Sequence, residues 1–506
     1  MMAVMLNQRY KRLLPWFGML VLAWLVRLPL LFGLGSLWND EAFSRHFALM
    51  PLLPALRYMA MDVHPPMHLI FLHAWIKAFG ASAVALRSMA LMFSLLGLAI
   101  FLKLARTLFG RSEALLAGAL FIFSPVMAYY GVDARMYAML FFLGCLSGWL
   151  FWRVVEGDSR WTEAWMWVSL LLALTHVTGA LVLAGQALFL IVSKERRPSF
   201  WKLLWRFAMI GAVFCLWFVP AALFRLHSIH KEWQFRSGQD GIHAALALVD
   251  WVWLGLNKIQ LGLAFAVTGL LVLAGLLRRS DRRPHFVIPA ASAFLLCWLA
   301  AAFLPFLLFP NVSPRYLTAA VPPFFLLLAH GFLKAAGDTR RSLVLGVGLI
   351  AFFSLPGLAV QYAGRPYGWD RSAEWIVSHR QPGDRIVFAW YADRYAFEAL
   401  DDAALAARVG DAQGLYPFDD ALDADARYAA HAGTLAITEK DLDRMAPMFA
   451  GAKGVFFIPN DYLVMDGGRA DLAVTAWVER HGWFLADRLP SAGRTPGVWL
   501  LVRKEN

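Results

Sequence analysis

The sequence has few charged residues and few cysteines. Only 16% of its 506 residues are Asp, Glu, Lys or Arg, against about a quarter in soluble globular proteins, whereas 60% are apolar. This shortage of charge excludes a soluble enzyme with a single core, a disordered chain and a coiled coil. Cys145, Cys215 and Cys297 lie far apart in apolar runs, which excludes a disulfide framework and a CxxC-type zinc site. A polytopic membrane protein remains.

The positive charge is confined to the apolar part of the chain. Residues 1–361 carry 31 basic and 14 acidic residues, whereas residues 362–506 carry 16 and 21. No basic run is interleaved with aromatic residues, so the sequence predicts no nucleic-acid partner. The basic excess therefore needs a membrane explanation.

Apolar runs that suit membrane crossing recur throughout residues 1–361. A spanning helix needs about 20 mainly apolar residues. The stretch 163–193 is either two short helices, broken near Thr178 and Gly179, or one long tilted helix. Counted as two helices, it brings the candidate spans to eleven: roughly 13–35, 84–104, 112–130, 136–153, 163–177, 179–193, 203–223, 258–277, 286–309, 316–334 and 342–361.

Alternate connections between these spans are rich in Lys and Arg and so indicate the cytoplasmic side. They place the N-terminus inside and the tail outside the cytoplasmic membrane, which is the inner membrane of the cell. Residues 65–79 are too short to span and contain His68, His73 and Lys77, so we expect an interfacial or re-entrant helix on the outer face. The large outer loops are then about 36–83 and 224–257.

The acidic tail has the pattern of a soluble domain. Residues 362–506 form a predicted extracytoplasmic α/β domain, with amphipathic helices at 371–380 and 471–482. The fold class is therefore a polytopic α-helical membrane domain, residues 1–361, followed by this α/β domain. The predicted strands are Arg385–Tyr391, Thr434–Thr438, Gly454–Pro459 and Val498–Val502.

Separate segments bring ionisable residues to the predicted outer face. Such residues near hydrocarbon are energetically costly, and they are usually paired or functional. This gathering is the main functional signal in the residues themselves. The residues concerned are Asp40, Glu41, Asp62, His64, Asp133, Arg135, His176 and Arg315.

Each of these motifs is open to two interpretations. Asp40 is either a general base for an acceptor hydroxyl or the N-cap of a helix over 41–50. A helix start explains one proline of His64-Pro65-Pro66, but not the preceding Asp62 and His64. Arg135 with Tyr137, and Arg315 with Tyr316, either bind phosphate or anchor helices at the interface.

The second outer loop and two further arginines carry weaker signals. Lys231 and its neighbours line a substrate entrance, coordinate a metal or are solvated loop residues, and their spacing matches no metal motif. Arg27 and Arg87, near span ends, are more consistent with snorkelling or bridge partners than with catalysts.

Several of these stretches resemble the GT-C glycosyltransferases, in particular the group of protein O-mannosyltransferases and lipid A aminoarabinose transferases. The resemblance covers about 36–140 and extends through 393. His-Pro-Pro is closer to the mannosyltransferase form than to the acid-Lys-Pro-Pro form of the aminoarabinose transferases. The stretches are WNDEAFS, DVHPPMHLIFLHAWIKAFG, ALRSMALMFSLLGLAIFLKLARTLFG, DARMYAML, SPRYLTAAVPPFFLLLA and SAEWIVSHRQPGDRIVF.

The resemblance implies an enzyme that transfers a sugar from a polyprenyl-phosphate donor to a hydroxyl acceptor, with inversion, outside the cytoplasmic membrane. The acceptor is a lipid, a glycan or a protein. Asp40 would be the general base, supported by Glu41. The donor phosphate would be held by Arg135 and Arg315, helped by Tyr137 and Tyr316, with His64 beside the leaving group.

Other assignments from the sequence are less specific. Asp62, Asp133, His176 and Lys231 are candidate substrate contacts. Some relatives bind a divalent ion, but no clear ligand set is visible here and we assign no cofactor. A transporter or flippase of a polar lipid is the main alternative, although it predicts internal repeats and midplane charges that this chain does not show. A non-catalytic scaffold would leave Asp40, His64 and Arg135 unexplained.

The predicted orientation can be tested by cysteine labelling in a background without the three native cysteines. Gly238→Cys, in the second outer loop, should react with a membrane-impermeant thiol reagent added outside intact cells. Ser280→Cys, in a basic connection, should react only after the cells are opened. The reverse pattern would overturn the orientation.

Overall fold

The computed structural model describes most of the chain, and everything below concerns those residues. The described residues are 2–61, 64–228, 258–276, 278–279, 286–308, 314–364, 367–388, 391–410, 412–414, 439–459, 469–491 and 495–503.

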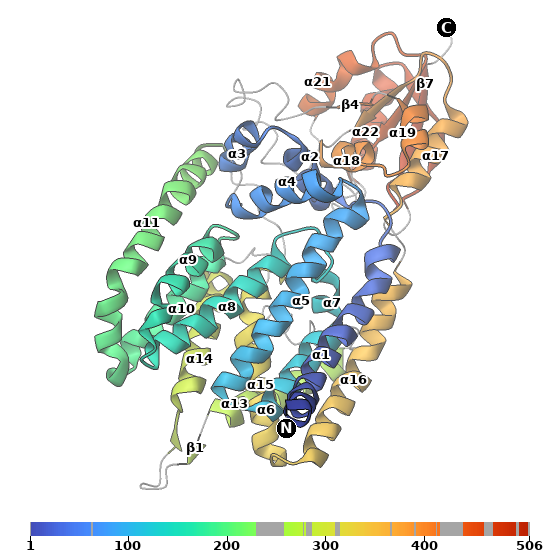
Figure 1. The fold of residues 1–506 in the computed structure, drawn as a ribbon. Helices are drawn as coiled ribbons and strands as arrows, with labels where there is room; N and C mark the ends of the chain where they lie inside the picture. The colour runs from blue at the N-terminus through green and yellow to red at the C-terminus, as the bar shows by residue number, and fades with distance from the viewer. Residues whose placement is uncertain are drawn as a thin grey trace.

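Residues 2–363 form a helical bundle (Figure 1). Short 3-10 helices, η1 (Ser159–Trp161), η2 (Lys194–Arg196) and η3 (Pro314–Ala320), join some of the α-helices. The α-helices are α1 (Met2–Gly33), α2 (Asn39–Leu49), α3 (Leu52–Met61), α4 (Met67–Phe79), α5 (Ala83–Leu108), α6 (Arg111–Phe123), α7 (Pro125–Tyr130), α8 (Tyr137–Val155), α9 (Thr162–Ala173), α10 (Gly179–Val192), α11 (Arg197–Ser228), α13 (Lys258–Leu276), α14 (Ala290–Leu308), α15 (Val321–Ala336) and α16 (Arg340–Ala363).

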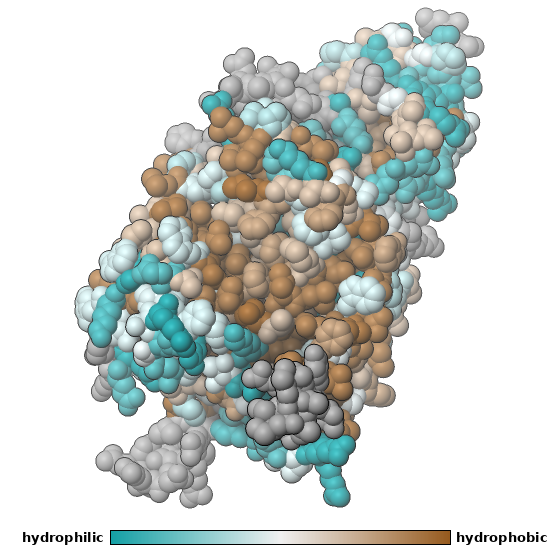
Figure 2. Space-filling model, in the orientation of Figure 1, coloured by the Kyte–Doolittle hydropathy of each residue, from teal (hydrophilic) through white to brown (hydrophobic). Residues whose placement is uncertain are grey.

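The distribution of apolar side chains over the bundle is that of a multi-pass membrane protein. In Figure 2, apolar side chains cover the middle of the molecule, and hydrophilic side chains gather toward its two ends. Within the described part of the chain, six helical segments are long and apolar enough to cross a membrane. They are Leu13–Gly33, Ala83–Leu108, Tyr137–Val155, Trp201–Leu223, Arg315–Ala336 and Arg340–Ala363.

Each predicted span coincides with helix over most of its described length, although the span 286–309 begins on a short strand, Phe286–Val287. The number of crossings stays a prediction. The stretch 163–193 is two helices, α9 and α10, separated by a turn. The span 112–130 is α6 followed by α7, where the Ser124 hydroxyl caps α7 by accepting a hydrogen bond from Met127 N–H at 3.3 Å. Pro125 occupies the first position of α7, where it removes no helical hydrogen bond.

The two ends of the molecule differ in content. The N-terminus lies at the same end as β1 (Arg278–Arg279), which pairs antiparallel with β2 (Phe286–Val287). The described elements after α16, called the C-terminal domain below, lie at the other end (Figure 1). Helix α4 covers most of the segment 65–79, which was predicted to be an interfacial or re-entrant helix. It lies across the end of the bundle beside α2, near the C-terminal domain. Most of the second predicted outer loop, 224–257, lies outside the described residues.

Trp298 of α14 packs closely against α8 and α10 and is hydrogen-bonded to η3. Gly148 on α8 and Gly185 on α10 leave room for it: a Cβ at Gly148 would lie 2.8 Å from the Trp298 ring, and one at Gly185 would lie 2.6 Å from the Trp298 Cα. Such close helix approach through small residues is typical of membrane bundles. The indole Nε1 of Trp298 donates to Ala319 O at 3.0 Å, which ties η3 to this core.

The C-terminal domain contains a five-stranded mixed sheet in the order β4-β3-β5-β7-β6. β3 is parallel to β4 and β5, and β7 is antiparallel to β5 and β6. The elements are β3 (Arg385–Phe388), β4 (Ala412–Gly414), β5 (Gly454–Ile458), β6 (Trp483–Leu489), β7 (Val498–Arg503), α17 (Trp369–His379), α18 (Tyr391–Glu398), α19 (Ala403–Val409), α21 (Glu439–Phe449) and α22 (Arg469–Arg480).

This sheet confirms the predicted C-terminal sheet only in part. β3, β5 and β7 match three predicted strands, but Tyr391 begins a helix rather than ending the first strand. The predicted strand Thr434–Thr438 lies outside the described residues. Strands β4 and β6 were not predicted, because β4 has three residues and β6, with the sequence WFLADRL, does not alternate apolar and polar residues.

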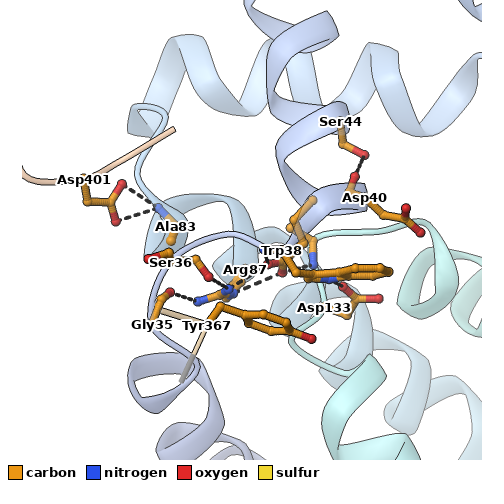
Figure 3. A network of polar contacts seen from close by, with 12 residues as sticks. Gly35, Ser36, Trp38, Asp40, Ser44, Ala83, Arg87, Asp133, Tyr367 and Asp401 are labelled. Atoms are coloured by element: carbon orange, nitrogen blue, oxygen red, sulfur yellow. Dashed lines mark hydrogen bonds and ion pairs between the residues drawn. The ribbon is translucent and has the colours of Figure 1, made fainter. Parts of the chain in front are cut away.

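The C-terminal domain packs directly on α2 and α5. Tyr395 of α18 stacks on His46 of α2, with ring centroids 4.0 Å apart. The Asp401 carboxylate accepts hydrogen bonds at 3.1 and 3.2 Å from Ala83 N–H, the first residue of α5 (Figure 3). An acidic group at a helix N-terminus is favourable, because it satisfies a free N–H and the helix dipole. The domain therefore supports α2, which carries Asp40 and Glu41, and α5, which carries Arg87.

Candidate functional site

Asp40 lies on the first turn of α2 and is paired with Arg315 of η3. Oδ2 of Asp40 lies 2.5 Å from Nη1 of Arg315, and the side chains of Asp40 and Arg315 are 28% and 24% exposed. Helix α2 begins at Asn39, so its N-cap position is Trp38. The N-cap interpretation of Asp40 is therefore wrong, and its carboxylate pairs with Arg315 rather than with the helix backbone.

Glu41, the next residue, is buried in an ion pair with Arg87 of α5. Arg87 Nε donates to Oε1 at 3.0 Å and Nη2 donates to Oε2 at 2.7 Å, with both side chains 1% exposed. The same guanidinium donates to the carbonyls of Gly35 and Ser36 (Figure 3). Oε1 also accepts from Ala134 N–H at 2.9 Å. Arg87 is thus a bridge partner, and Glu41 has no oxygen left facing a substrate.

Arg135 follows in the turn between α7 and α8 and is 5% exposed. Its Nη1 donates to Asp40 O at 3.0 Å and to Ser44 Oγ at 2.7 Å, and its Nη2 lies 3.2 Å from His64 Nε2. None of these partners is a carboxylate. A buried guanidinium without an anionic partner is energetically costly, so this position favours an incoming anion.

Asp133 lies two residues before Arg135 and is held by a different segment. Trp38 Nε1 donates to its Oδ1 at 2.9 Å (Figure 3). Burial, together with the nearby Glu41 carboxylate, raises the pKa of Asp133 well above its usual range. A protonated Asp133 leaves the Arg135 charge uncompensated, which again favours anion binding.

Several buried polar atoms at this site have no hydrogen-bond partner among the described residues. Such atoms are rare in proteins and often mark a ligand site. Ring contacts place two of the residues concerned, His176 and Tyr137, side by side, with ring centroids 5.9 Å apart, and the His176 ring also lies 4.9 Å from that of Tyr316. The atoms are Arg135 Nε, Arg315 Nε, Tyr137 OH, His68 Nε2, His176 Nε2 and Asp133 Oδ2.

A small pocket lies beside Arg135, between α2, α3 and α4. Burial and the Arg135 charge lower the pKa of His68, at its wall, to about 3, so this imidazole is neutral. The pocket is lined by Phe43, Ser44, Met59, His64, Pro65, His68, Leu69, Arg135 and Met136.

The structure brings most of the sequence-predicted residues together. Asp40, Glu41, His64, Asp133, Arg135, Tyr137, His176, Arg315 and Tyr316 meet at the end of the bundle that carries the C-terminal domain. Asp62 and Lys231 lie outside the described residues. Arg135 and Tyr137 are buried in protein, so the alternative that they anchor the chain in lipid is wrong.

Three residues of the site were missed from the sequence. His68 follows His64 at the spacing of one helical turn, which was a usable signal. Trp38 and Ser44 gave none, because only the fold shows that one contacts Asp133 and the other Arg135. Among the described residues, no three His, Cys, Asp or Glu side chains are grouped so as to hold a metal ion.

Comparison with known proteins bears on this arrangement. Residues 63–224 match the model of a family described as dolichyl-phosphate-mannose-protein mannosyltransferase. ArnT from Cupriavidus metallidurans, in the apo state, superposes with a TM-score of 0.59 at 14% identity, covering 96% of this chain and 97% of that chain. The chain has the GT-C fold. The resemblance predicted from the sequence is confirmed at the level of the fold.

Two further structures with the GT-C fold are similar. ArnT bound to undecaprenyl phosphate has a TM-score of 0.58 at 13% identity, covering 97% of this chain and 98% of that chain. The oligosaccharyltransferase of Archaeoglobus fulgidus, in the apo form, has a TM-score of 0.51 at 13% identity, covering 93% and 72%. No curated protein sequence matches the chain.

The buried Glu41–Arg87 pair generates a stability prediction. Glu41→Gln leaves the Arg87 charge buried without its partner, and such a change costs about 3–5 kcal/mol. We expect a large fall in the unfolding temperature of the purified protein in nanodiscs. Arg160→Ala, which removes an exposed ion pair with Asp158, is the control and should leave that temperature almost unchanged. Equal stability of the two variants would contradict the structural role of Glu41.

Proposed function

We propose that this protein is a glycosyltransferase that uses a polyprenyl-phosphate sugar on the outer face of the cytoplasmic membrane. The observation that carries the proposal is the buried Arg135 guanidinium, which has no anionic partner among the described residues and lies beside the Asp40–Arg315 pair. A carboxylate and two guanidinium groups are the groups needed when an alcohol displaces a phosphate. A membrane-embedded donor fits a site at the end of a hydrophobic bundle.

The reaction is an inverting displacement at the anomeric carbon. The acceptor oxygen forms a bond to this carbon while the bond from the carbon to the phosphate oxygen breaks. Asp40 takes the proton of the acceptor hydroxyl as general base. The electron pair of the broken bond stays on the lipid phosphate, where Arg135 and Arg315 stabilise the growing negative charge.

Arg315 serves both reactants in this proposal. Its Nη1 contacts Asp40, while its Nε is buried without a partner and available to a phosphate oxygen. A phosphate that draws on Arg315 weakens the pairing of Asp40 and leaves that carboxylate more available to a proton. Donor binding would then prepare the base before the acceptor reacts.

Glu41 differs in role from its neighbour. The sequence suggested that Glu41 supports the base or orients the acceptor. Its oxygens are occupied by Arg87, Ala134 and the Trp38 N–H, at 3.4 Å. We assign Glu41 and Arg87 as positioning residues, and Tyr137, Tyr316 and His64 as neighbours of the donor phosphate. Asp133 and the undescribed Asp62 and Lys231 stay candidate substrate contacts.

The comparisons support the donor class and leave the sugar and the acceptor open. One similar structure is of ArnT bound to undecaprenyl phosphate, and the matched family is named for a dolichyl-phosphate-linked mannose donor. Lipids, glycans and proteins stay candidate acceptors. No comparison favours the flippase alternative.

The base assignment predicts the behaviour of Asp40→Asn. This variant keeps the size of the side chain but cannot accept the proton, so transfer should slow by about 100-fold or more. It should still fold and bind polyprenyl phosphate. Transfer is measured with purified protein in nanodiscs and a panel of lipid-phosphate sugars, with Asp158→Asn, near the basic connections, as control. Wild-type rates for Asp40→Asn would reject the base.

The phosphate assignment predicts weaker donor binding by Arg135→Gln. Each lost hydrogen bond to a charged group is worth about 1.5–3 kcal/mol, or roughly tenfold to hundredfold in affinity. The affinity for undecaprenyl phosphate in nanodiscs measures this change. Arg153→Gln, whose guanidinium pairs with Asp158, is the matched control. If both variants bind the lipid alike, Arg135 has no phosphate role.

A further inference from the structure

His176 occupies the turn between α9 and α10 and is fully buried. Thr178 N–H donates to its Nδ1 at 3.2 Å, and the Thr178 hydroxyl lies 2.7 Å from the same atom. A backbone N–H can only donate, so Nδ1 must be an unprotonated acceptor. The imidazole is therefore neutral, and its single proton is on Nε2.

The Nε2–H of His176 is a buried donor without a partner among the described residues. A buried donor left unsatisfied costs about 1–3 kcal/mol, and a structure that keeps one generally uses it. The turn that contains His176 is hydrogen-bonded to the start of α4, directly after His64-Pro65-Pro66, because Met67 N–H donates to Leu174 O at 2.9 Å.

The surroundings of this donor are cationic or neutral. The His176 ring lies 5.7 Å from the His64 ring, and Tyr137 and Tyr316 flank it. Arg135 Nε and Arg315 Nε are two further buried donors without partners among the described residues. Arg135 Nη2 lies 3.2 Å from Nε2 of His64, and Arg315 directly precedes Tyr316 in the chain. Each of the three N–H groups lacks a partner among the described residues, and an oxyanion bound between these side chains would satisfy them.

We propose that His176 donates a hydrogen bond from Nε2 to the lipid phosphate, as a third donor beside Arg135 and Arg315. The inference rests on the proposed function. Because the imidazole is neutral, it adds a directed hydrogen bond without adding another buried positive charge to two guanidinium groups. Its contribution strengthens as negative charge grows on the phosphate during bond breaking. No proton is transferred from His176, because Nε2–H stays a donor throughout.

The test compares two lipids that differ only in the anion. Full-length protein in nanodiscs is titrated with undecaprenyl phosphate and with undecaprenol, and the ratio of the two affinities isolates the phosphate contribution. His176→Phe keeps a ring but removes the donor. We expect it to lower the affinity for the phosphate about tenfold and to leave the affinity for the alcohol unchanged.

Two further variants separate hydrogen bonding from structural support. His176→Gln places an amide N–H near the original Nε2 and should restore most of the lost phosphate affinity. Thr178→Val removes the hydroxyl but keeps the backbone N–H that sets the tautomer, so its affinity ratio should stay close to that of the wild type. Unfolding temperatures of all variants show whether the fold is retained.

The outcomes distinguish this inference from the proposed function. If wild-type protein does not prefer the phosphate to the alcohol, the proposed lipid-phosphate donor fails. If the wild type prefers the phosphate and His176→Phe keeps the same ratio, only the role of His176 fails. Equal losses for both lipids in His176→Phe, without rescue by His176→Gln, would assign His176 to the fold and also overturn the inference.

Discussion

The buried ion pair between Glu41 and Arg87 is the interaction on which the candidate site depends. One carboxylate binds the guanidinium of α5 and the Ala134 N–H, and the same guanidinium binds the carbonyls that precede α2. Asp40 precedes Glu41 and Arg135 follows Ala134, so a single buried charge pair places both the proposed base and the proposed phosphate ligand. The C-terminal domain reinforces the pair through Asp401, which caps the first turn of α5.

The charges around this pair explain why the site favours an anion. Glu41 is neutralised by Arg87 and Asp40 by Arg315, while burial and the nearby Glu41 raise the pKa of Asp133 and so favour its neutral form. Arg135 is then the charge left over among the described residues. A phosphate at this position removes the cost of that buried charge, and the energy that it gains grows as the leaving group takes up negative charge. The same electrostatics therefore serve donor binding and catalysis.

The sequence predicted the helices and the candidate residues better than it predicted their contacts. Apolar runs extend over many consecutive residues and can be read directly from the sequence. The helices, the break between α9 and α10 and three of the five strands of the C-terminal sheet were therefore visible. Asp40 and Glu41 are adjacent and alike in sequence, yet one faces Arg315 and the other is buried against Arg87. That difference depends on where α5 and η3 lie, as does the role of Ser44 beside Arg135, and no local pattern encodes it. The short strand β4 and the strand β6, which has apolar residues at consecutive positions, lacked the apolar alternation that marks a strand.

The central claim is that these separate segments form one anion site at the end of the bundle that carries the C-terminal domain. An experimental structure of the protein in nanodiscs with bound undecaprenyl phosphate tests it most directly. The account predicts phosphate density in contact with Arg135 and Arg315, with the Asp40 carboxylate facing the same cavity. Phosphate density at the opposite end of the bundle, or bound away from both arginines, would contradict it.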